Sequence, residues 1–341
     1  MNSLKRSQLS VFLSVFMALV LLLGLASCAG READVPSEAP PASSSPSVPS
    51  RPAPSFANPL DVPGGPDNPP TDIPSFTELV AEKHAINSDT RGWLYLPNTT
   101  VNEVVVWNQD PVFYLRRNFA REYYFDGIAY VDSRTRWGDN GRGRRQDLSR
   151  NTVIYGHSME DIPGVENMTL EQLAGVQPDN PRNSPLLFTE FKKLLNERFA
   201  RQTPYVFFST LDEDMVWEIF SIHYSNTSVD YNEPNPSDAA WEFLIQDAKA
   251  RSIWNYDVNV GANDKIITFS TCIYDIDGTP LPSDRDSIFR YVVMARLVER
   301  DAPLKAEASF TRNPSPRSGR IAIQGNTVWT WQAGSWTSAP R

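Results

Sequence analysis

Short runs of apolar and β-branched residues, separated by turn-forming residues, recur through the middle of this 341-residue chain. Runs of about four to eight such residues are typical of β-strands, whereas a helix needs a longer amphipathic pattern. The clearest strand candidates are residues 101–107, 128–131, 152–155, 205–208, 215–223, 265–269 and 289–298. Many short strands with few helices predict a mainly β fold, either a barrel or a sandwich.

Three helical patterns interrupt these strands. Ser75 and Glu78 fit a capping box ahead of an N-terminal helix. Apolar residues share one helical face over residues 188–195 and again over residues 241–248. The last pattern starts just after Asn235-Pro236, which suits a helix cap and first turn. The predicted fold is therefore strands with a few inserted helices.

The first 28 residues have a different character. Lys5 and Arg6 precede an uncharged apolar run over residues 11–26, as in a secretory signal. This run is short for a membrane span, which needs about 20 apolar residues. The ending Leu25-Ala26-Ser27-Cys28 resembles the lipobox of bacterial lipoproteins, which implies that Cys28 is lipidated; an uncleaved anchor is the alternative. Either alternative tethers the chain to the outer face of the cytoplasmic membrane.

The segment 29–74 is predicted to be a disordered stalk. Thirteen of the 28 prolines fall between residues 35 and 74, and large apolar side chains are scarce there. Such a segment cannot bury enough surface to fold, and proline keeps it extended. We predict one folded domain over residues 75–302 and an extension over 303–341. Gly325-Asn326 predicts a small hairpin in this extension, whose tryptophans are expected to pack.

Composition excludes several classes of protein. At 40% hydrophobic and 21% charged residues, the chain is not globally disordered. A formal charge of −9 argues against a nucleic-acid partner. Two cysteines are too few for a disulfide scaffold or a four-thiolate zinc site. Because the sequence also lacks a metal-ligand cluster and a phosphate loop, we expect no metal and no cofactor.

Cys272 is the only thiol of the mature chain if Cys28 carries lipid. A single thiol is unusual outside the cell, where cysteines normally pair. Cys272 ends the strand-like sequence Thr268-Phe269-Ser270-Thr271. It could be a small buried side chain, or it could form a disulfide with Cys28 in an unprocessed chain. The functional alternative is that Cys272 is a nucleophile, which requires a nearby base or positive charge to raise the fraction of thiolate.

Histidine is the natural base, and the chain has three. His84 falls in the N-terminal helix, and His223 could be an ordinary strand residue. His157 follows an apolar strand and Gly156, which lets the backbone turn. Two neighbouring strands that each end in a reactive side chain would bring Cys272 and His157 together over one barrel opening.

A cation would stabilise the negative charge that develops on a carbonyl oxygen during acyl transfer. Arg290, at the start of the strand 289–298, is one candidate. Arg285 lies closer to Cys272 in sequence and is the rival candidate.

Together, three segments resemble the histidine, cysteine and arginine motifs of the sortase family. They are residues 151–159 (NTVIYGHSM), 268–272 (TFSTC) and 289–297 (FRYVVMARL). Residues 92–97 (GWLYLP), the strand 101–107 and residues 126–132 (DGIAYVD) are similar to the N-terminal half of class B sortases. A helix between residue 223 and Cys272 resembles the insertion that marks class B. The resemblance covers about residues 75–300.

The resemblance implies a closed eight-stranded β-barrel with inserted helices and a cysteine transpeptidase of the Gram-positive cell surface. It assigns Cys272 as nucleophile, His157 as general acid and base, and Arg290 as the cation at the oxyanion. Thr271 could assist at the oxyanion, and Asp275 could orient His157 or bind substrate.

The implied reaction cleaves a C-terminal sorting signal of surface proteins. The acyl group then passes to an amine of a peptidoglycan precursor or of another surface protein. Membrane contact is expected through the lipid on Cys28. We expect substrate specificity to reside around residues 241–256.

Three features depart from the family pattern. Sortases usually keep an uncleaved anchor, the loop 273–289 is longer than in typical class B members, and the tail after Pro303 has no evident counterpart. Two alternatives stay open. One is a non-catalytic sortase-like surface lipoprotein that binds such proteins. The other is a different cell-wall cysteine peptidase or L,D-transpeptidase, in which Arg290 would have no role.

Overall fold

A computed structural model describes residues 73–138, 141–179, 183–273, 275–276, 279–280, 288–324, 327–332 and 335–340. The signal segment with Cys28, nearly all of the stalk, Arg285 and the turn at Gly325-Asn326 lie outside the described residues, and so does the side chain of Asp275. Within the described ranges, no helix is long and apolar enough to cross a membrane.

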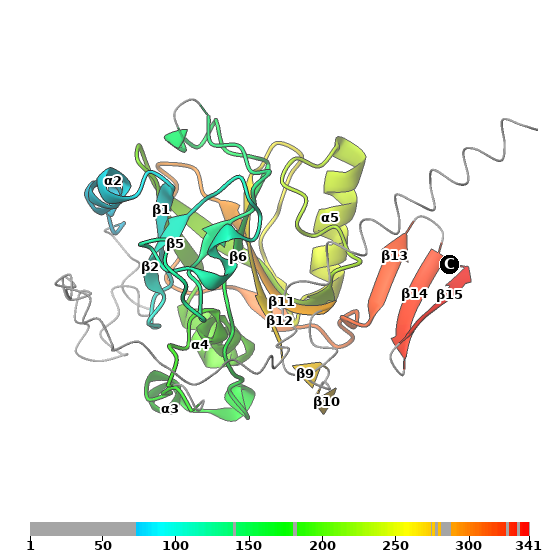
Figure 1. Cartoon of the computed structure of the whole chain (residues 1–341). Coiled ribbons are helices and arrows are strands. Elements are labelled where there is room, and N and C mark those ends of the chain that lie inside the picture. The colour runs from blue at the N-terminus through cyan, green and yellow to red at the C-terminus, as the bar shows by residue number, and fades with distance from the viewer. Residues whose placement is uncertain are drawn as a thin grey trace, which may run out of the picture.

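Eight strands close into a barrel, which confirms the mainly β prediction (Figure 1). Around the barrel the strand order is β1-β2-β3-β4-β8-β11-β6-β5. The bounds are β1 Thr90–Tyr95, β2 Asn102–Val106, β3 Tyr130–Val131, β4 Asn151–Tyr155, β5 Tyr205–Ser209, β6 Asp214–Asn226, β8 Ile266–Cys272 and β11 Phe289–Leu297. These strands coincide with the apolar runs in the sequence because each run alternates across, or fills, a buried wall.

Two pairings in the barrel are parallel, β2 with β3 and β4 with β8, and the others are antiparallel. The long strand β6 pairs with β11 over nine residues of β11, with one register shift between Met294 and Ala295. Strands β8 and β11 are therefore central in the wall, each hydrogen-bonded on both sides.

The helices lie outside the barrel or at its ends, and their caps differ from the prediction. They are α2 Thr77–Ile86, η1 Phe113–Arg116, η3 Val165–Asn167, α3 Leu170–Ala174, η4 Phe188–Leu195, α4 Glu197–Gln202 and α5 Asp238–Arg251. The capping box at Ser75 was wrong, because the cap residue of α2 is Phe76 and makes no side-chain cap bond. The cap of α5 is Ser237 rather than Asn235, since its hydroxyl accepts from the Ala240 N–H. Residues 188–195 form a buried 3-10 helix.

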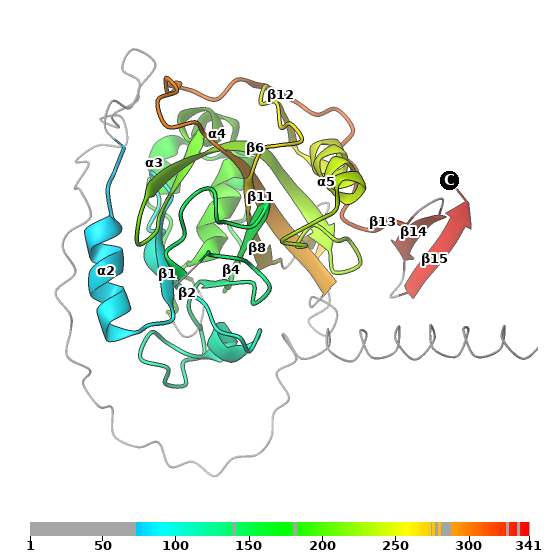
Figure 2. The same cartoon turned by 90° about the horizontal axis from the view of Figure 1, so that it is seen from above.

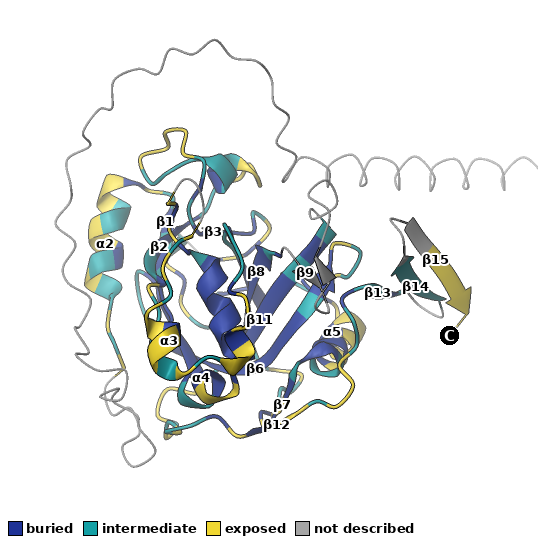
Figure 3. Ribbon diagram, turned by 90° about the horizontal axis from the view of Figure 1, so that it is seen from below, coloured by how far each residue is buried: buried dark blue, intermediate teal, exposed yellow. Residues whose placement is uncertain are grey.

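The barrel strands are largely buried (Figure 3), and their apolar side chains form a hydrophobic core. Trp217, Ile154 and Phe269 are at most 1% exposed and belong to one continuous core that includes η4. Burial of this large apolar surface is the main force that closes the barrel.

The extension after residue 302 is structured. Strand β12 (Phe310–Arg312) pairs with β7 (Trp254–Tyr256), and Phe310 packs against Trp254 with ring centroids 5.1 Å apart. Beyond α5 lies a separate antiparallel sheet of β13 (Ile321–Gln324), β14 (Thr327–Gln332) and β15 (Ser335–Pro340) (Figure 2). The predicted hairpin corresponds to β13 and β14, and β15 is an addition that was not predicted.

Candidate active site

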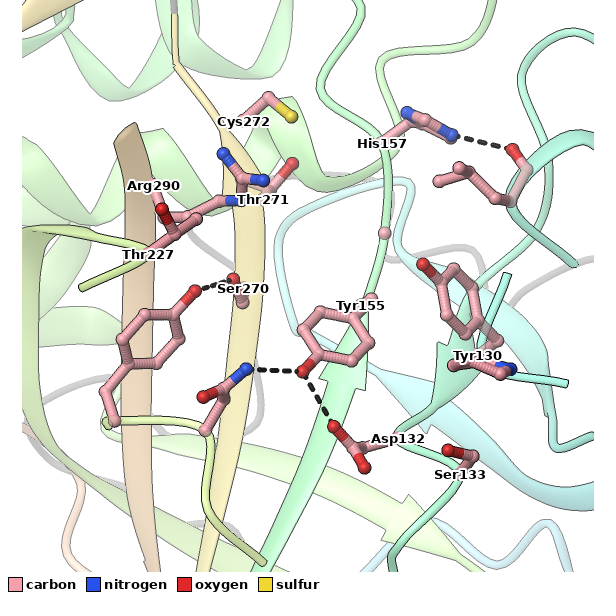
Figure 4. A pocket seen from close by; sticks show the side chains of 15 residues that line it. Tyr130, Asp132, Ser133, Tyr155, His157, Thr227, Ser270, Thr271, Cys272 and Arg290 are labelled. Carbon is pink, nitrogen blue, oxygen red and sulfur yellow. Dashed lines mark hydrogen bonds between the residues drawn. The ribbon is translucent and has the colours of Figure 1, made fainter. Parts of the chain in front are cut away.

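One pocket of about 270 Å³ opens where β4, β8 and β11 end (Figure 4). Cys272, His157, Arg290 and Thr271, all singled out from the sequence, line it. His157 is more than 100 positions from the other three in the chain, so the barrel topology brings it to them.

The position of His157 beside Cys272 follows from strand register. In the parallel pair β4–β8, the last aligned residues are Tyr155 and Ser270. His157 and Cys272 each lie two residues beyond that pair. The Gly156 N–H donates to the Ser270 carbonyl at 3.3 Å and continues the pairing by one step. His157 and Cys272 therefore line the same pocket.

Arg290 reaches the pocket from the other side of β8. It is the direct antiparallel partner of Cys272 and of Ser225 on β6. One guanidinium nitrogen, Nη1, donates to the Phe289 carbonyl at 2.8 Å, and the side chain lines the pocket. Arg285 lies outside the described residues, so its position is not compared.

A backbone carbonyl fixes the orientation of the His157 ring. Nε2 lies 2.8 Å from the Leu115 carbonyl oxygen, which can only accept, so Nε2 carries the proton in the neutral ring. Nδ1 is then the unprotonated nitrogen, and Figure 4 shows it on the Cys272 side of the ring. Burial lowers the pKa of His157 below 6.5, and the positive charge of Arg116 lowers it further. The ring is therefore neutral at pH 7.

The backbone around His157 is held from behind by η4. The Phe188 N–H donates to the His157 carbonyl at 3.0 Å, and Ser158 forms a bridge with Leu187. A Cβ at Gly156 would lie 2.5 Å from Cγ of Phe188, so only glycine allows this close approach. The Phe188 ring packed against Gly156 is thus the reason that this turn needs a glycine.

Thr271 is 3% exposed and lines the pocket next to Cys272. Its hydroxyl oxygen has no hydrogen-bond partner among the described residues, and Figure 4 shows it directed into the pocket. A buried hydroxyl in this state can donate to a substrate oxygen without losing an existing bond. Asp275 lies in the short strand β9 (Asp275–Ile276), and its role stays a prediction because its side chain is not described.

A polar network that the sequence did not reveal lines the far half of the pocket. The Tyr155 hydroxyl donates to Asp132 at 2.8 Å, and Asn232 donates to the same hydroxyl at 2.9 Å. Arg134 holds both oxygens of the Asp132 carboxylate, at 2.9 Å each. Burial and the Asp132 charge raise the pKa of Tyr155, so this hydroxyl stays protonated. The only sequence signal was that Tyr155 stands two residues before His157.

The role in substrate specificity that the sequence analysis expected of residues 241–256 stays a prediction. Residues of α5 are absent from the described pocket lining, and Trp241 instead packs in the core and donates to the Gly261 carbonyl. Thr227 and Tyr231, in the connection between β6 and α5, form the wall beside Arg290, and Asn232 continues this wall toward Tyr155. Tyr231 is buried, with its hydroxyl 2.9 Å from Ser270 Oγ. Aperiodic connections of this kind give no pattern from which their path can be read.

The other two histidines lie away from the pocket. His223 is 1% exposed in β6, and burial lowers its pKa to about 3. His84 lies in α2, where its Nδ1 is 3.2 Å from the Thr90 carbonyl. Within the described ranges, no cluster of three or more His, Cys, Asp or Glu side chains could hold a metal ion.

Comparison with known proteins identifies relatives of this chain. Sortase B of Listeria monocytogenes is 26% identical over 188 residues, and sortase B of Staphylococcus aureus is 24% identical over the same length. Each match covers 55% of this chain and 64% of the relative. No protein-family model matches the chain.

Solved structures are also similar. The S. aureus sortase B–substrate complex superposes with a TM-score of 0.49 at 23% identity, covering 65% of this chain and 86% of that one. Clostridium perfringens sortase B superposes with a TM-score of 0.48 at 25% identity, covering 64% of this chain and 99% of that one.

The fold and the pocket define a closed β-barrel protein whose adjacent strands bring a thiol, an imidazole and a guanidinium together, the set of groups that thiol-dependent acyl transfer requires. Within that class, the chain is similar in sequence to the class B sortases of L. monocytogenes and S. aureus.

Proposed function

We propose that this protein is a cell-surface cysteine transpeptidase that cleaves a C-terminal sorting signal and transfers the acyl group to an amine. The observation that carries the proposal is the convergence of Cys272, His157 and Arg290 on one pocket. The sequence relationship to sortase B supports the same reaction class.

In the first step, Cys272 Sγ attacks the carbonyl carbon of the scissile peptide bond. His157 accepts the thiol proton at Nδ1, because its Nε2 already donates to Leu115. Arg290 and the Thr271 hydroxyl donate to the carbonyl oxygen as it becomes negative. The carbon–nitrogen bond then breaks as the His157 imidazolium returns its proton to the leaving amine, and a thioester on Cys272 results.

In the second step, the acceptor amine attacks the thioester carbon. His157 takes a proton from the attacking nitrogen, and Cys272 leaves with the electrons of the carbon–sulfur bond. The acceptor is an amine of a peptidoglycan precursor or of another surface protein. Tyr155 and Asn232 line the half of the pocket away from Arg290 and are available for polar contacts with a bound peptide.

We further propose that lipid on Cys28 anchors the protein to the outer face of the membrane, with residues 29–74 as a stalk. Metabolic labelling with a fatty-acid analogue tests this. Wild type should incorporate the label and Cys28→Ala should not. Equal labelling and processing of both proteins would contradict lipidation of Cys28.

The transpeptidase proposal is tested with the full chain carrying Cys28→Ala, so that Cys272 is its only cysteine. Incubation with a library of sorting-signal peptides should yield a thioacyl adduct on Cys272, detected by mass spectrometry, and Cys272→Ala should yield none. If no peptide acylates Cys272 while Cys272→Ala binds peptides as well as its parent, the protein is a binding module instead.

A further inference from the structure

The first part of the C-terminal extension beyond β12, residues 313–321, crosses the end of α5 and reaches the end of β6; we call this segment the strap. The Asn313 N–H donates to the Ile253 carbonyl, and the Arg317 N–H donates to the Ala250 carbonyl, both at 2.9 Å. Strand β13 begins at the end of the strap, and its neighbour β14 carries Trp331.

A buried charged group fastens the strap to α5. Arg251 is 1% exposed and donates to the carbonyls of Ser318 at 2.9 Å and Ile321 at 2.7 Å. Asp247 neutralises Arg251 at 2.6 Å and also pairs with Arg317 of the strap. A buried guanidinium that lost these carbonyls would be left with unsatisfied donors, so α5 and the strap are strongly coupled.

Asn226, the last residue of β6, connects the strap to the pocket wall. It is fully buried, and its Nδ2 donates to the carbonyls of Gly319 at 2.6 Å and Ile321 at 3.3 Å. Its Oδ1 accepts from the Ser228 N–H at 2.9 Å, in the connection that supplies Thr227 to the pocket. One amide group thus holds the strap on one side and the pocket wall on the other.

The same residue lies beside the strand that carries Arg290. Asn226 is the antiparallel partner of Phe289, the residue before Arg290. The Phe289 ring is covered by Trp331, with centroids 6.2 Å apart, and by the Arg320 guanidinium at 5.6 Å. Strand ends are where a barrel wall opens most readily, and here strap, β6 and β11 close that end together.

We propose that Asn226 is a positioning residue, through which the strap holds the Arg290 end of β11 in register with Cys272. The inference rests on the proposed function for the role of Arg290 at the oxyanion. It also has a consequence that needs no substrate, because a guanidinium beside a thiol favours the thiolate. Loss of the Asn226 amide lets the end of β11 move away from Cys272.

The experiment uses the full chain with Cys28→Ala and compares Asn226→Ala with a matched control, Asn313→Ala. Asn313 makes the same pair of bonds, from its Nδ2 to the Ser252 carbonyl at 2.8 Å and from the Ser315 N–H to its Oδ1 at 3.0 Å, but it lies at the edge of β7. The first readout is the pH dependence of Cys272 alkylation by iodoacetamide. The second is kcat and KM for acylation by the peptide found above.

For Asn226→Ala we expect the alkylation midpoint to move to higher pH. We also expect kcat to fall roughly ten- to hundredfold with a smaller change in KM, since a small misplacement of a catalytic group costs that much. Asn313→Ala should show a comparable loss of thermal stability with neither effect. Equal behaviour of the two variants in both readouts would overturn the proposal.

Two provisions keep the test decisive. If Asn226→Ala does not fold, Asn226→Ser takes its place under the same criteria, because the shorter hydroxyl side chain cannot make the amide bonds to Gly319 and Ile321. If the parent protein forms no thioacyl adduct, the alkylation profile alone tests whether Asn226 positions Arg290. The inference and the proposed function can therefore fail separately.

Discussion

Cys272 and Arg290 stand directly opposite each other in the antiparallel ladder of β8 and β11. Residues in such a pair have Cα atoms about 4.5–5.5 Å apart and side chains on the same face. The backbone ladder, rather than a loop, therefore sets how far the guanidinium can lie from the thiol. Strand β6 holds Arg290 from its other side, opposite Ser225, so this spacing is fixed as long as the ends of the strands stay paired.

Replacing Arg290 with glutamine should slow acylation without unfolding the barrel. Removal of one donor at a developing oxyanion costs about 10²–10³-fold in kcat. We expect a loss of this order for Arg290→Gln, with KM changed much less, in single-turnover acylation followed by mass spectrometry. Arg296→Gln is the control, because Arg296 lies on the same strand but pairs with Glu218 at its other end. Equal losses in the two variants would argue against the assigned role of Arg290.

The acid limit of activity should follow the pKa of His157. Since burial lowers that pKa below 6.5, the acylation rate should fall to half its maximum only at a pH below 6.5. Arg116 lowers the same pKa by its charge, so Arg116→Ala should move the acid limb to higher pH. The measurement is kcat/KM from pH 4 to pH 8.

Arg117→Ala is the matched control for Arg116→Ala. Arg116 stacks on Phe125 and donates to its carbonyl, and Arg117 makes the same two contacts with Phe113. An acid limb that moves equally in both variants would show that loop disturbance, not charge, controls the pH profile.

The sequence predicted the reactive side chains because they stand at the ends of strands. Apolar runs with period two or continuous burial mark β4, β8 and β11, and a reactive residue directly after a strand has little freedom in where it lies. The register of the parallel pair β4–β8 then places His157 beside Cys272. Strand position and side-chain chemistry together therefore pointed to His157 and Cys272, whereas the choice of Arg290 over Arg285 rested on the resemblance to sortases.

Other parts of the site depend on contacts that no local pattern encodes. Tyr231 and Asn232 reach the pocket through an irregular connection, and the Leu115 carbonyl that orients His157 is a backbone atom from another segment. The cap of α5 was misplaced because Asn235, Pro236 and Ser237 all favour a helix start, and only tertiary packing chooses among them. Long-range contacts decide these features, so single-sequence reasoning misses them.

Replacing Gly156 with alanine should displace His157. The added Cβ would lie 2.5 Å from the Phe188 ring, which is itself fixed against Phe191 with centroids 4.9 Å apart. Overpacking of this kind costs about 1–3 kcal/mol of stability. We expect Gly156→Ala to lower both the melting temperature and kcat, and Phe188→Leu in the same chain to restore part of each. At Gly175 the nearest atom to an added Cβ is 3.5 Å away, so Gly175→Ala should leave kcat unchanged.

His223 should make the protein sensitive to acid. It is buried in β6 and its Nδ1–H donates to Ser221 Oγ at 2.9 Å, because that hydroxyl itself donates to the Ala248 carbonyl. Burial lowers the pKa of His223 from 6.5 to about 3, so the folded protein keeps this ring neutral at a pH where the unfolded chain protonates it.

Between these two pKa values the unfolded state binds one more proton than the folded state. The stability contributed by neutral His223 is therefore complete above pH 6.5 and is lost as the pH falls, by up to about 1.4 kcal/mol per pH unit. Urea unfolding at pH 7, 6 and 5 should show this slope in the parent and a shallower one in His223→Gln, even if that variant is less stable at pH 7. His84→Gln, on the outer helix α2, should keep the parental slope. A slope unchanged by His223→Gln would mean that carboxylates, whose protonation also favours unfolding, control acid stability.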